Sequence, residues 1–133
     1  MPELPEVETV RRGIDRVIPG ATLQSVTLKR KDLRWPIPVR AVRDLQTRTL
    51  QTTSRRSKYL CLHFDGARQP IAMIHLGMSG RLWIDPSDSA DLSEWRDHEH
   101  WRMDFGHLVL RYVDPRRFGM LDVVAGAAFD NHK

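Results

Sequence analysis

Residues 58–76 read KYLCLHFDGARQPIAMIHL, and this stretch sets the expectation for the fold. Two apolar runs, 58–64 and 71–76, flank Asp65-Gly66, a dipeptide typical of turns. About eight strands of this kind are predicted along the chain: 22–28, 49–55, 58–64, 71–76, 81–84, 101–105, 107–113 and 118–123. Short strands with tight, glycine-containing links predict a mainly β fold, either an antiparallel β-sandwich, which we favour, or a barrel-like domain.

A helix is predicted near the N-terminus, after Pro5. Proline suits the first helical turn, and Pro19-Gly20 provides the stop. Glu8 and Arg12 are spaced as an i,i+4 ion pair on its outer side. Residues 39–45 can form one further short helix. The apolar residues recur at three or four positions, as on one helix face: Val7, Val10, Ile14 and Val17.

The composition is that of a globular domain. The 133 residues are 41% hydrophobic and 29% charged, which is enough for one domain with a core. No run of ~18 apolar residues and no secretion signal is present, so we expect a cytoplasmic protein with no membrane partner. The single cysteine, Cys61, lies in an apolar stretch and is predicted to be a buried thiol.

The charge favours a polyanionic partner. The formal net charge is +4 and the pI is near 9.7. Basic residues gather at 29–34, 55–58 and 116–117, whereas acids concentrate between Asp85 and Asp104. A solvated basic face would have the same pattern, so the charge alone leaves both interpretations open.

The first residues place an amine beside two carboxylates. Met1 is usually removed before a small residue, which would leave Pro2 as a free secondary amine close to Glu3 and Glu6. An α-amino group titrates near ~7.7–8.0, so a good part of it is unprotonated at neutral pH and can attack a sugar aldehyde carbon. Proline and acids are also ordinary residues at a helix start, and that structural role is the alternative.

Residues 1–14, MPELPEVETVRRGI, closely resemble the N-terminus of bacterial formamidopyrimidine-DNA glycosylases. Three further segments resemble motifs of that family: RRSKY at 55–59, HLGMSG at 75–80 and DPRRFG at 114–119. The resemblance implies a β-sandwich N-terminal domain flanked by helices. It also implies base-excision repair of DNA: removal of 8-oxoguanine and formamidopyrimidines, then cleavage of the abasic strand by β,δ-elimination.

The resemblance assigns catalysis to four residues. Pro2 would attack C1′ of the damaged nucleotide and form a Schiff base, Glu3 would be the acid/base for opening of the sugar ring, and Glu6 would orient the site. Lys58 would assist catalysis on oxidised purines. Without the resemblance, a lysine in a strand turn is expected to be a solubilising charge.

Five further residues are assigned to DNA contact by the resemblance: His75, Met78, His98, Arg116 and Phe118. Met78 would fill the gap left by an extruded base, Arg116 would bond the orphaned partner base, and Phe118 would wedge between base steps. His75 would approach a phosphate. The alternatives are a core methionine beside a hairpin turn for Met78 and a structural histidine at a strand end for His75.

The segment Asp97-His98-Glu99-His100 departs from the family pattern, because Asp97 replaces a basic residue. Two histidines at i,i+2 would share a face of a strand, as metal ligands can. No further ligand is clearly placed, so we predict no metal site.

Residues 1–133 are predicted to be an isolated N-terminal catalytic domain, about half of a full-length family member. The helical domain and the zinc finger of such members are absent, and the chain has no Cys-x-x-Cys pair, so no zinc and no other cofactor is expected in it. The expected partners are duplex DNA with oxidised purines or abasic sites, at the bacterial nucleoid, and the absent C-terminal domain as an intramolecular partner.

Two other classes of function stay open at this point. A truncated domain could bind DNA weakly and be catalytically inactive alone, because half of the DNA-binding surface is missing. A β-rich protein-interaction domain with an incidental basic face is the third. Strong salt dependence of DNA binding would separate the DNA functions from it.

Overall fold

The computed structural model describes residues 4–87 and 94–129, with side chains from Val7 onward. Strands dominate this part of the chain, as predicted. In order, the elements are α1 (Leu4–Val17), β1 (Ser25–Leu28), α2 (Val39–Arg43), β2 (Leu50–Arg56), β3 (Tyr59–Phe64), β4 (Ile71–His75), β5 (Arg81–Pro86), β6 (Glu99–Asp104), β7 (Leu108–Val113), β8 (Met120–Val124) and α3 (Gly126–Phe129).

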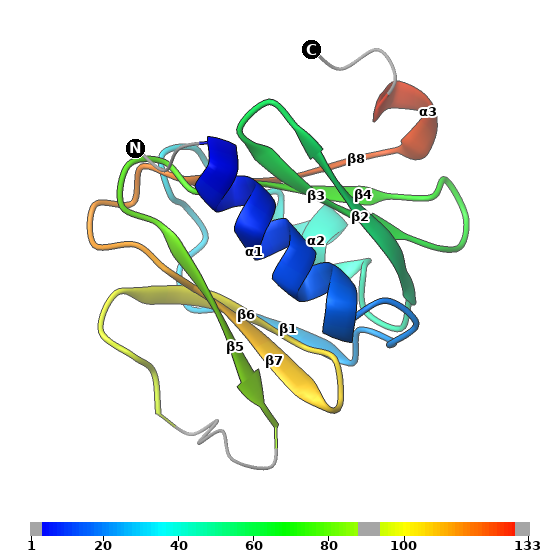
Figure 1. The fold of residues 1–133 in the computed structure, drawn as a ribbon, viewed down its shortest axis with the longest axis horizontal. Helices are drawn as coiled ribbons and strands as arrows, with labels where there is room; N and C mark the ends of the chain where they lie inside the picture. Colours follow the sequence, from blue (N-terminus) through cyan, green and yellow to red (C-terminus); the bar gives the residue numbers. More distant parts are fainter. Residues whose placement is uncertain (1–3, 88–93, 130–133) are drawn as a thin grey trace.

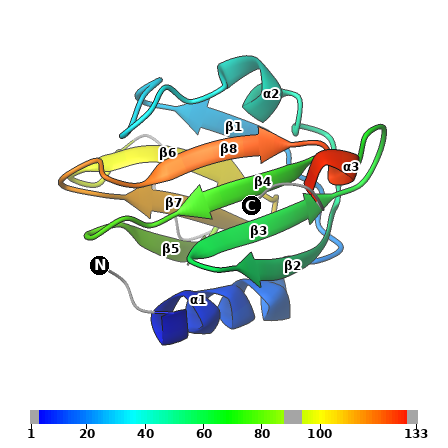
Figure 2. The same ribbon diagram turned by 90° about the horizontal axis from the view of Figure 1, so that it is seen from above.

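Two antiparallel four-stranded sheets form a β-sandwich (Figures 1 and 2). One sheet has the order β1-β6-β7-β5 and the other β2-β3-β4-β8. The helix α1 lies along one open side next to β2, and α2 covers the opposite side near β1 and β8 (Figure 2). The eight strands, the flanking N-terminal helix and the short helix near residue 40 are confirmed. No helix in residues 4–87 and 94–129 is long and apolar enough to span a membrane.

The core lies between the sheets and is built from large apolar side chains. Trp101 of β6 stacks on Tyr112 of β7 with 5.5 Å between ring centroids. Phe64 of β3 stacks on Phe105, which follows β6, at 6.4 Å and so joins the two sheets. Cys61 is fully buried in β3, as expected, and burial raises the pKa of its thiol.

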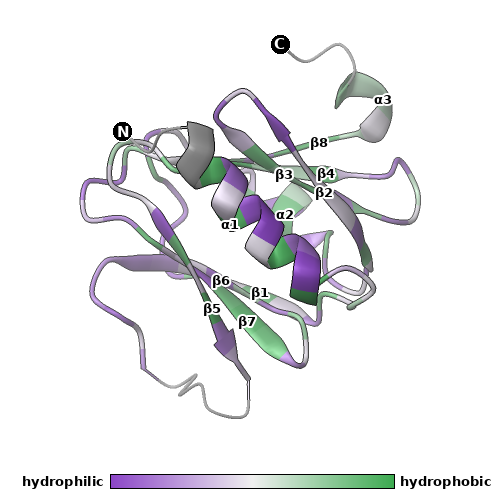
Figure 3. Cartoon of the chain, viewed as in Figure 1, coloured by the Kyte–Doolittle hydropathy of each residue, from purple (hydrophilic) through white to green (hydrophobic). Residues whose placement is uncertain are grey.

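The apolar stripe of α1 differs from the prediction at its end. Val7 and Ile14 are buried, but Val17 is 45% exposed, and Ile18 takes its place in the core. Ile18 lies four residues after Ile14, on the same helical face, whereas Val17 is rotated away from it. Figure 3 shows hydrophilic and hydrophobic residues alternating along α1, whereas β7 is largely hydrophobic.

Charged groups hold α1 against β2. The Glu8 carboxylate pairs with Arg11 at 2.6 Å and with Arg12 at 2.9 Å, and it lies 3.5 Å from Arg55 of β2. The hydrogen bond from Arg11 is the largest reason why the pKa of Glu8 falls to about 2. The expected Glu8–Arg12 pair is thus confirmed, and it belongs to a larger network. Because the network crosses to β2, it links the N-terminal half of α1 to this strand.

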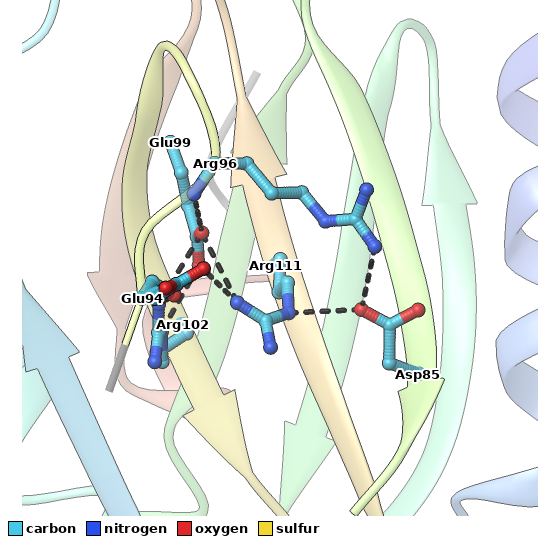
Figure 4. Close-up of polar contacts among 6 residues, drawn as sticks. All are labelled: Asp85, Glu94, Arg96, Glu99, Arg102 and Arg111. Carbon is cyan, nitrogen blue, oxygen red and sulfur yellow. Dashed lines mark hydrogen bonds and ion pairs between the residues drawn. The ribbon is translucent and has the colours of Figure 1, made fainter. Parts of the chain in front are cut away.

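The acids expected to be segregated from the bases are partly paired with them. Glu99 is fully buried on the face of its sheet that is turned away from the core, 3.0 Å from Arg102 and 3.1 Å from Arg111 (Figure 4). Asp85 lies 2.9 Å from Arg111 and 3.1 Å from Arg96. The outer face of the β5-β7-β6 strands thus carries a buried cluster of ion pairs.

Candidate nucleic-acid interface

The register of the β2-β3-β4-β8 sheet brings the predicted site segments together at one end of its strands. We call this end of the sheet the edge that carries the site. Arg56 pairs with Tyr59, Tyr59 with His75, and His75 with Met120 across four successive strands. The β2–β3 turn, the β4–β5 loop and the β7–β8 loop therefore lie side by side. The first turn of α1 points to the same edge (Figure 2).

A hollow of about 340 Å³ lies between the β4–β5 and β7–β8 loops, lined by Arg34, His75, Gly77, Met78 and Phe118. Met78 is 51% exposed and Phe118 is 40% exposed. The core-methionine alternative for Met78 is therefore wrong. Two large apolar side chains beside a basic hollow are unusual on a surface with no partner, and they indicate a binding function.

His75 ends β4 and faces the hollow in a defined protonation state. Its Nδ1 accepts a hydrogen bond of 3.0 Å from the Gly77 amide, and its ring meets Tyr59 edge-on at 5.1 Å. Burial lowers the pKa of His75, and the positive charges of Lys58 and Arg34 lower it further. The lowered pKa favours the neutral ring, and in a neutral ring whose Nδ1 accepts a hydrogen bond the proton is on Nε2. The residue is thus both a structural strand-end histidine and a possible donor to an anion.

Lys58 lies in the two-residue turn between the paired Arg56 and Tyr59. Ser57 has a φ of 53°, in the left-handed region, which tightens this turn. The Lys58 side chain is half-buried and close enough to His75 to lower its pKa. The turn therefore adds a cation next to the hollow.

The β7–β8 loop carries the other two predicted contacts. The Arg116 guanidinium lies 4.9 Å from the centroid of the Phe118 ring, a cation–π distance. Both side chains are exposed. The loop therefore presents the apolar Phe118 ring and the guanidinium donors of Arg116 to a ligand at this edge.

His98 lies at the same edge, just before β6, and its ring is exposed. Its carbonyl accepts a hydrogen bond of 2.9 Å from the Asp114 amide. His100 is instead buried, with Nε2 at 2.6 Å from the Asp114 carbonyl oxygen. The two rings thus have different surroundings. Within residues 4–87 and 94–129, no cluster of three His, Cys, Asp or Glu side chains could hold a metal ion.

The predicted catalytic residues at the N-terminus are outside this description. Pro2 and Glu3 lie outside the described residues. Glu6 lies in the first turn of α1, but its side chain is not among those described. Their assignments remain predictions.

Two residues of the site were not singled out from the sequence. Arg34 was noted only as part of a basic stretch, yet its amide lies 3.3 Å from the Gly119 carbonyl oxygen, which brings it to the hollow. Asp114 was noted only as the first residue of the DPRRFG segment, yet its carboxylate is buried at the base of the loops. The sequence signal for Asp114 is an acid two residues before the first of two arginines.

Known proteins resemble this chain over its length. The family model of the formamidopyrimidine-DNA glycosylase N-terminal domain matches residues 1–121. The formamidopyrimidine-DNA glycosylase of Acidiphilium cryptum is 47% identical over 134 residues, covering 100% of this chain and 46% of the relative. That of Bordetella pertussis is 50% identical over 119 residues, covering 90% of this chain and 41% of the relative. The chain thus spans less than half the length of these relatives.

Solved structures match the fold as well. A Lactococcus lactis formamidopyrimidine-DNA glycosylase in complex with DNA containing Fapy-dG has a TM-score of 0.83 at 28% identity, covering 97% of this chain and 46% of that one. The same enzyme bound non-covalently to DNA with an AP site has a TM-score of 0.82 at 29% identity, covering 98% of this chain and 48% of that one.

Proposed function

Because this chain belongs to the formamidopyrimidine-DNA glycosylase family, we propose that it is the N-terminal catalytic domain of a DNA glycosylase with AP-lyase activity that acts on oxidised purines. One observation carries the proposal: Lys58, His75, Met78 and the Arg116–Phe118 loop share one edge with the start of α1. DNA with a damaged base, as bound by the Lactococcus lactis enzyme, is the proposed substrate.

The exposed apolar side chains suit an enzyme that extrudes a nucleotide. An enzyme reaches C1′ of a stacked nucleotide only after that nucleotide has left the duplex. Met78 is slender and unbranched and can enter the vacated space, while Phe118 can wedge between base steps. Arg116 can donate to the orphaned base. Their shared position at one edge supports a single insertion site.

The donors around the hollow suit a phosphate backbone. Lys58 supplies a cation, and His75 supplies a neutral Nε2–H donor that needs no protonation at pH 7. The first turn of α1 points to the same edge as these donors (Figure 2). The proposed nucleophile, Pro2, is two residues before that turn begins at Leu4.

The proposed chemistry uses the Pro2 nitrogen as nucleophile. Its lone pair forms a bond to C1′ while the C1′–N bond to the damaged base breaks and the base leaves with that electron pair. The N–H proton of the resulting ammonium passes to Glu3, which delivers it to the ring oxygen. The freed nitrogen lone pair then expels that oxygen, so the sugar opens and an iminium ion forms. This iminium has no N–H to lose, so it remains an electron sink during elimination of the 3′ and then the 5′ phosphate. Glu6 orients the site, and Lys58 assists as a proton donor near the base.

We assign no zinc to this chain. The structural zinc that the resemblance implies needs cysteine ligands, and the single cysteine, Cys61, is fully buried in β3. The zinc finger and the helical domain would belong to the further length that the relatives have.

Borohydride trapping tests the proposal. The chain is incubated with duplex DNA containing an abasic site, reduced with borohydride and analysed by peptide mass spectrometry, after intact mass has established that Met1 is absent. We expect a covalent adduct at Pro2. A chain that retains Met1 is the matched control, because its Pro2 is an amide. An adduct at Lys58 instead would contradict the assignment of the nucleophile.

A second candidate is a DNA-binding domain that is inactive alone, because the exposed Met78 and Phe118 beside the hollow suit DNA binding whether or not Pro2 reacts. This candidate predicts no adduct with a free Pro2, but duplex binding that weakens steeply with salt. Loss of both trapping and salt-dependent binding would contradict both DNA functions.

A further inference from the structure

A single buried carboxylate joins the loops that border the hollow. Asp114 has no exposed surface. Its Oδ1 accepts hydrogen bonds from the Ser79 hydroxyl at 2.5 Å and the Arg116 amide at 3.2 Å. Its Oδ2 accepts from the Tyr112 hydroxyl at 2.6 Å and the Gly119 amide at 3.0 Å. We call these five residues the Asp114 clamp.

Glycines allow the main chains of the β4–β5 and β7–β8 loops to approach each other closely beside the clamp. A Cβ atom on Gly77 would lie 2.7 Å from the Phe118 carbonyl carbon. A Cβ atom on Gly119 would lie 2.5 Å from the His75 carbonyl oxygen. The β4–β5 and β7–β8 loops are therefore in backbone contact, and no side chain separates them. A shift of one loop is transmitted to the other.

The clamp also reaches the start of β6. The Asp114 amide donates to the His98 carbonyl, and the His100 ring lies at hydrogen-bond distance from the Asp114 carbonyl oxygen. Main chain and side chain of one residue thus connect three segments at this edge. None of these bonds uses the exposed atoms of Met78 or Phe118, which stay available to a ligand.

We propose that Asp114 is a positioning residue that, through Ser79, fixes the spacing between Met78 and Phe118 for insertion into damaged DNA. This inference rests on the proposed function. Asp114 touches no reacting atom; it acts through the two loops. Of its four side-chain hydrogen bonds, three come from residues 112–119, on its own side of the site. Only the bond from Ser79 crosses to the loop of Met78.

The variant Ser79→Ala removes this crossing bond and leaves the other three. A matched control exists in Ser87→Ala, because the Ser87 hydroxyl donates a bond of the same 2.5 Å length to the Gly106 carbonyl at the other end of β5. Ser79→Thr keeps a hydroxyl donor and is the rescue variant. Circular dichroism melting of all variants establishes that each is folded.

The functional readout is the preference for damaged DNA, measured as the ratio of Kd values for an intact duplex and for the same duplex with a tetrahydrofuran abasic analogue. We expect Ser79→Ala to lower this ratio roughly tenfold, as for the loss of one hydrogen bond to a charged acceptor. Ser87→Ala and Ser79→Thr should stay within about twofold of the native ratio. An unchanged ratio in Ser79→Ala would overturn the proposal.

A second readout needs no DNA. Amide relaxation by NMR at residues 116–119, which are remote in sequence from Ser79, should show added exchange in Ser79→Ala and none in Ser87→Ala. If relaxation there is unchanged, the clamp does not position the loop, however DNA binding behaves. If the native chain shows no preference for the abasic duplex, the proposed function fails, and the relaxation comparison alone then decides whether Ser79 couples the loops.

Discussion

Truncation of Phe118 gives the most direct test of the insertion site. The ring is 40% exposed beside the hollow, and Arg116 stacks on it at 4.9 Å. Stacking between an aromatic side chain and a base contributes about 1–3 kcal/mol. Since 1.4 kcal/mol corresponds to a tenfold change in affinity, Phe118→Ala should weaken binding to abasic-analogue DNA about 5- to 150-fold. Because the ring is outside the core, the free energy of unfolding should change by less than about 1 kcal/mol.

The chain offers a closely matched control in Trp83. Its ring is 46% exposed in β5 and has the Arg96 guanidinium 4.8 Å from its centroid. The ring therefore has a similar exposure and the same kind of cationic neighbour as Phe118, but lies outside the hollow. Trp83→Ala should change the affinity by less than about twofold.

Competition fluorescence anisotropy at fixed ionic strength measures both variants, with intact and abasic-analogue duplexes as competitors. Fixed salt matters because phosphate contacts alone can change affinity by orders of magnitude. We expect Phe118→Ala to lose affinity for the abasic duplex and to keep its affinity for the intact one. Equal losses in Phe118→Ala and Trp83→Ala, or no loss in either, would refute an insertion role for Phe118.

Three further predictions concern the scaffold. Glu99→Gln removes one carboxylate from two buried guanidiniums, of which Arg111 keeps Asp85, and should lower the free energy of unfolding by about 3–5 kcal/mol in urea titrations. Gly119→Ala puts a Cβ atom 1.8 Å from the Tyr112 hydroxyl and should lower the free energy of unfolding by at least about 1–3 kcal/mol. In Gly13→Ala the added Cβ atom has nothing within 4 Å, so this variant should instead stabilise α1 by up to about 1 kcal/mol. Thermal unfolding measures both changes. Burial alone would raise the pKa of Asp114, but its four hydrogen bonds outweigh burial and hold the pKa below the usual value of an aspartate. The ionised form therefore stabilises the fold above about pH 4, and the stability gap between the native chain and Asp114→Asn should narrow as the pH falls below that value.

The fold could be predicted because its determinants are local. The strand runs alternate or are continuously apolar, and Asp65-Gly66, Gly77 and Gly106 mark the links between them. The error at Val17 is also local, since the face of a helix drifts and Ile18 is the better match. The helix α3 was not predicted from the sequence.

The parts of the site that escaped prediction depend on contacts between distant residues. Ser79 and Asp114 are 35 positions apart, and nothing near either of them shows that the hydroxyl and the carboxylate meet. Glu99 and Arg111 are in strands where charged residues usually face solvent, and only the assembled sheet shows that they are buried. Arg34 reaches the hollow because its loop binds the main chain at Gly119.

At this edge the exposed side chains are available to a ligand, and the buried groups hold the loops that carry them. Met78 and Phe118 expose apolar surface, which contributes little to folding and so is best explained by a ligand. Because these two side chains are not packed in the core, core packing does not fix their orientation. Their loops must then be held from behind, and a buried carboxylate with four donors does this more rigidly than apolar packing, because each hydrogen bond fixes a direction as well as a distance. The position of Asp114 behind Met78 and Phe118 is therefore what an insertion site requires. A solvated basic face without a ligand would not require its loops to be fixed in this way.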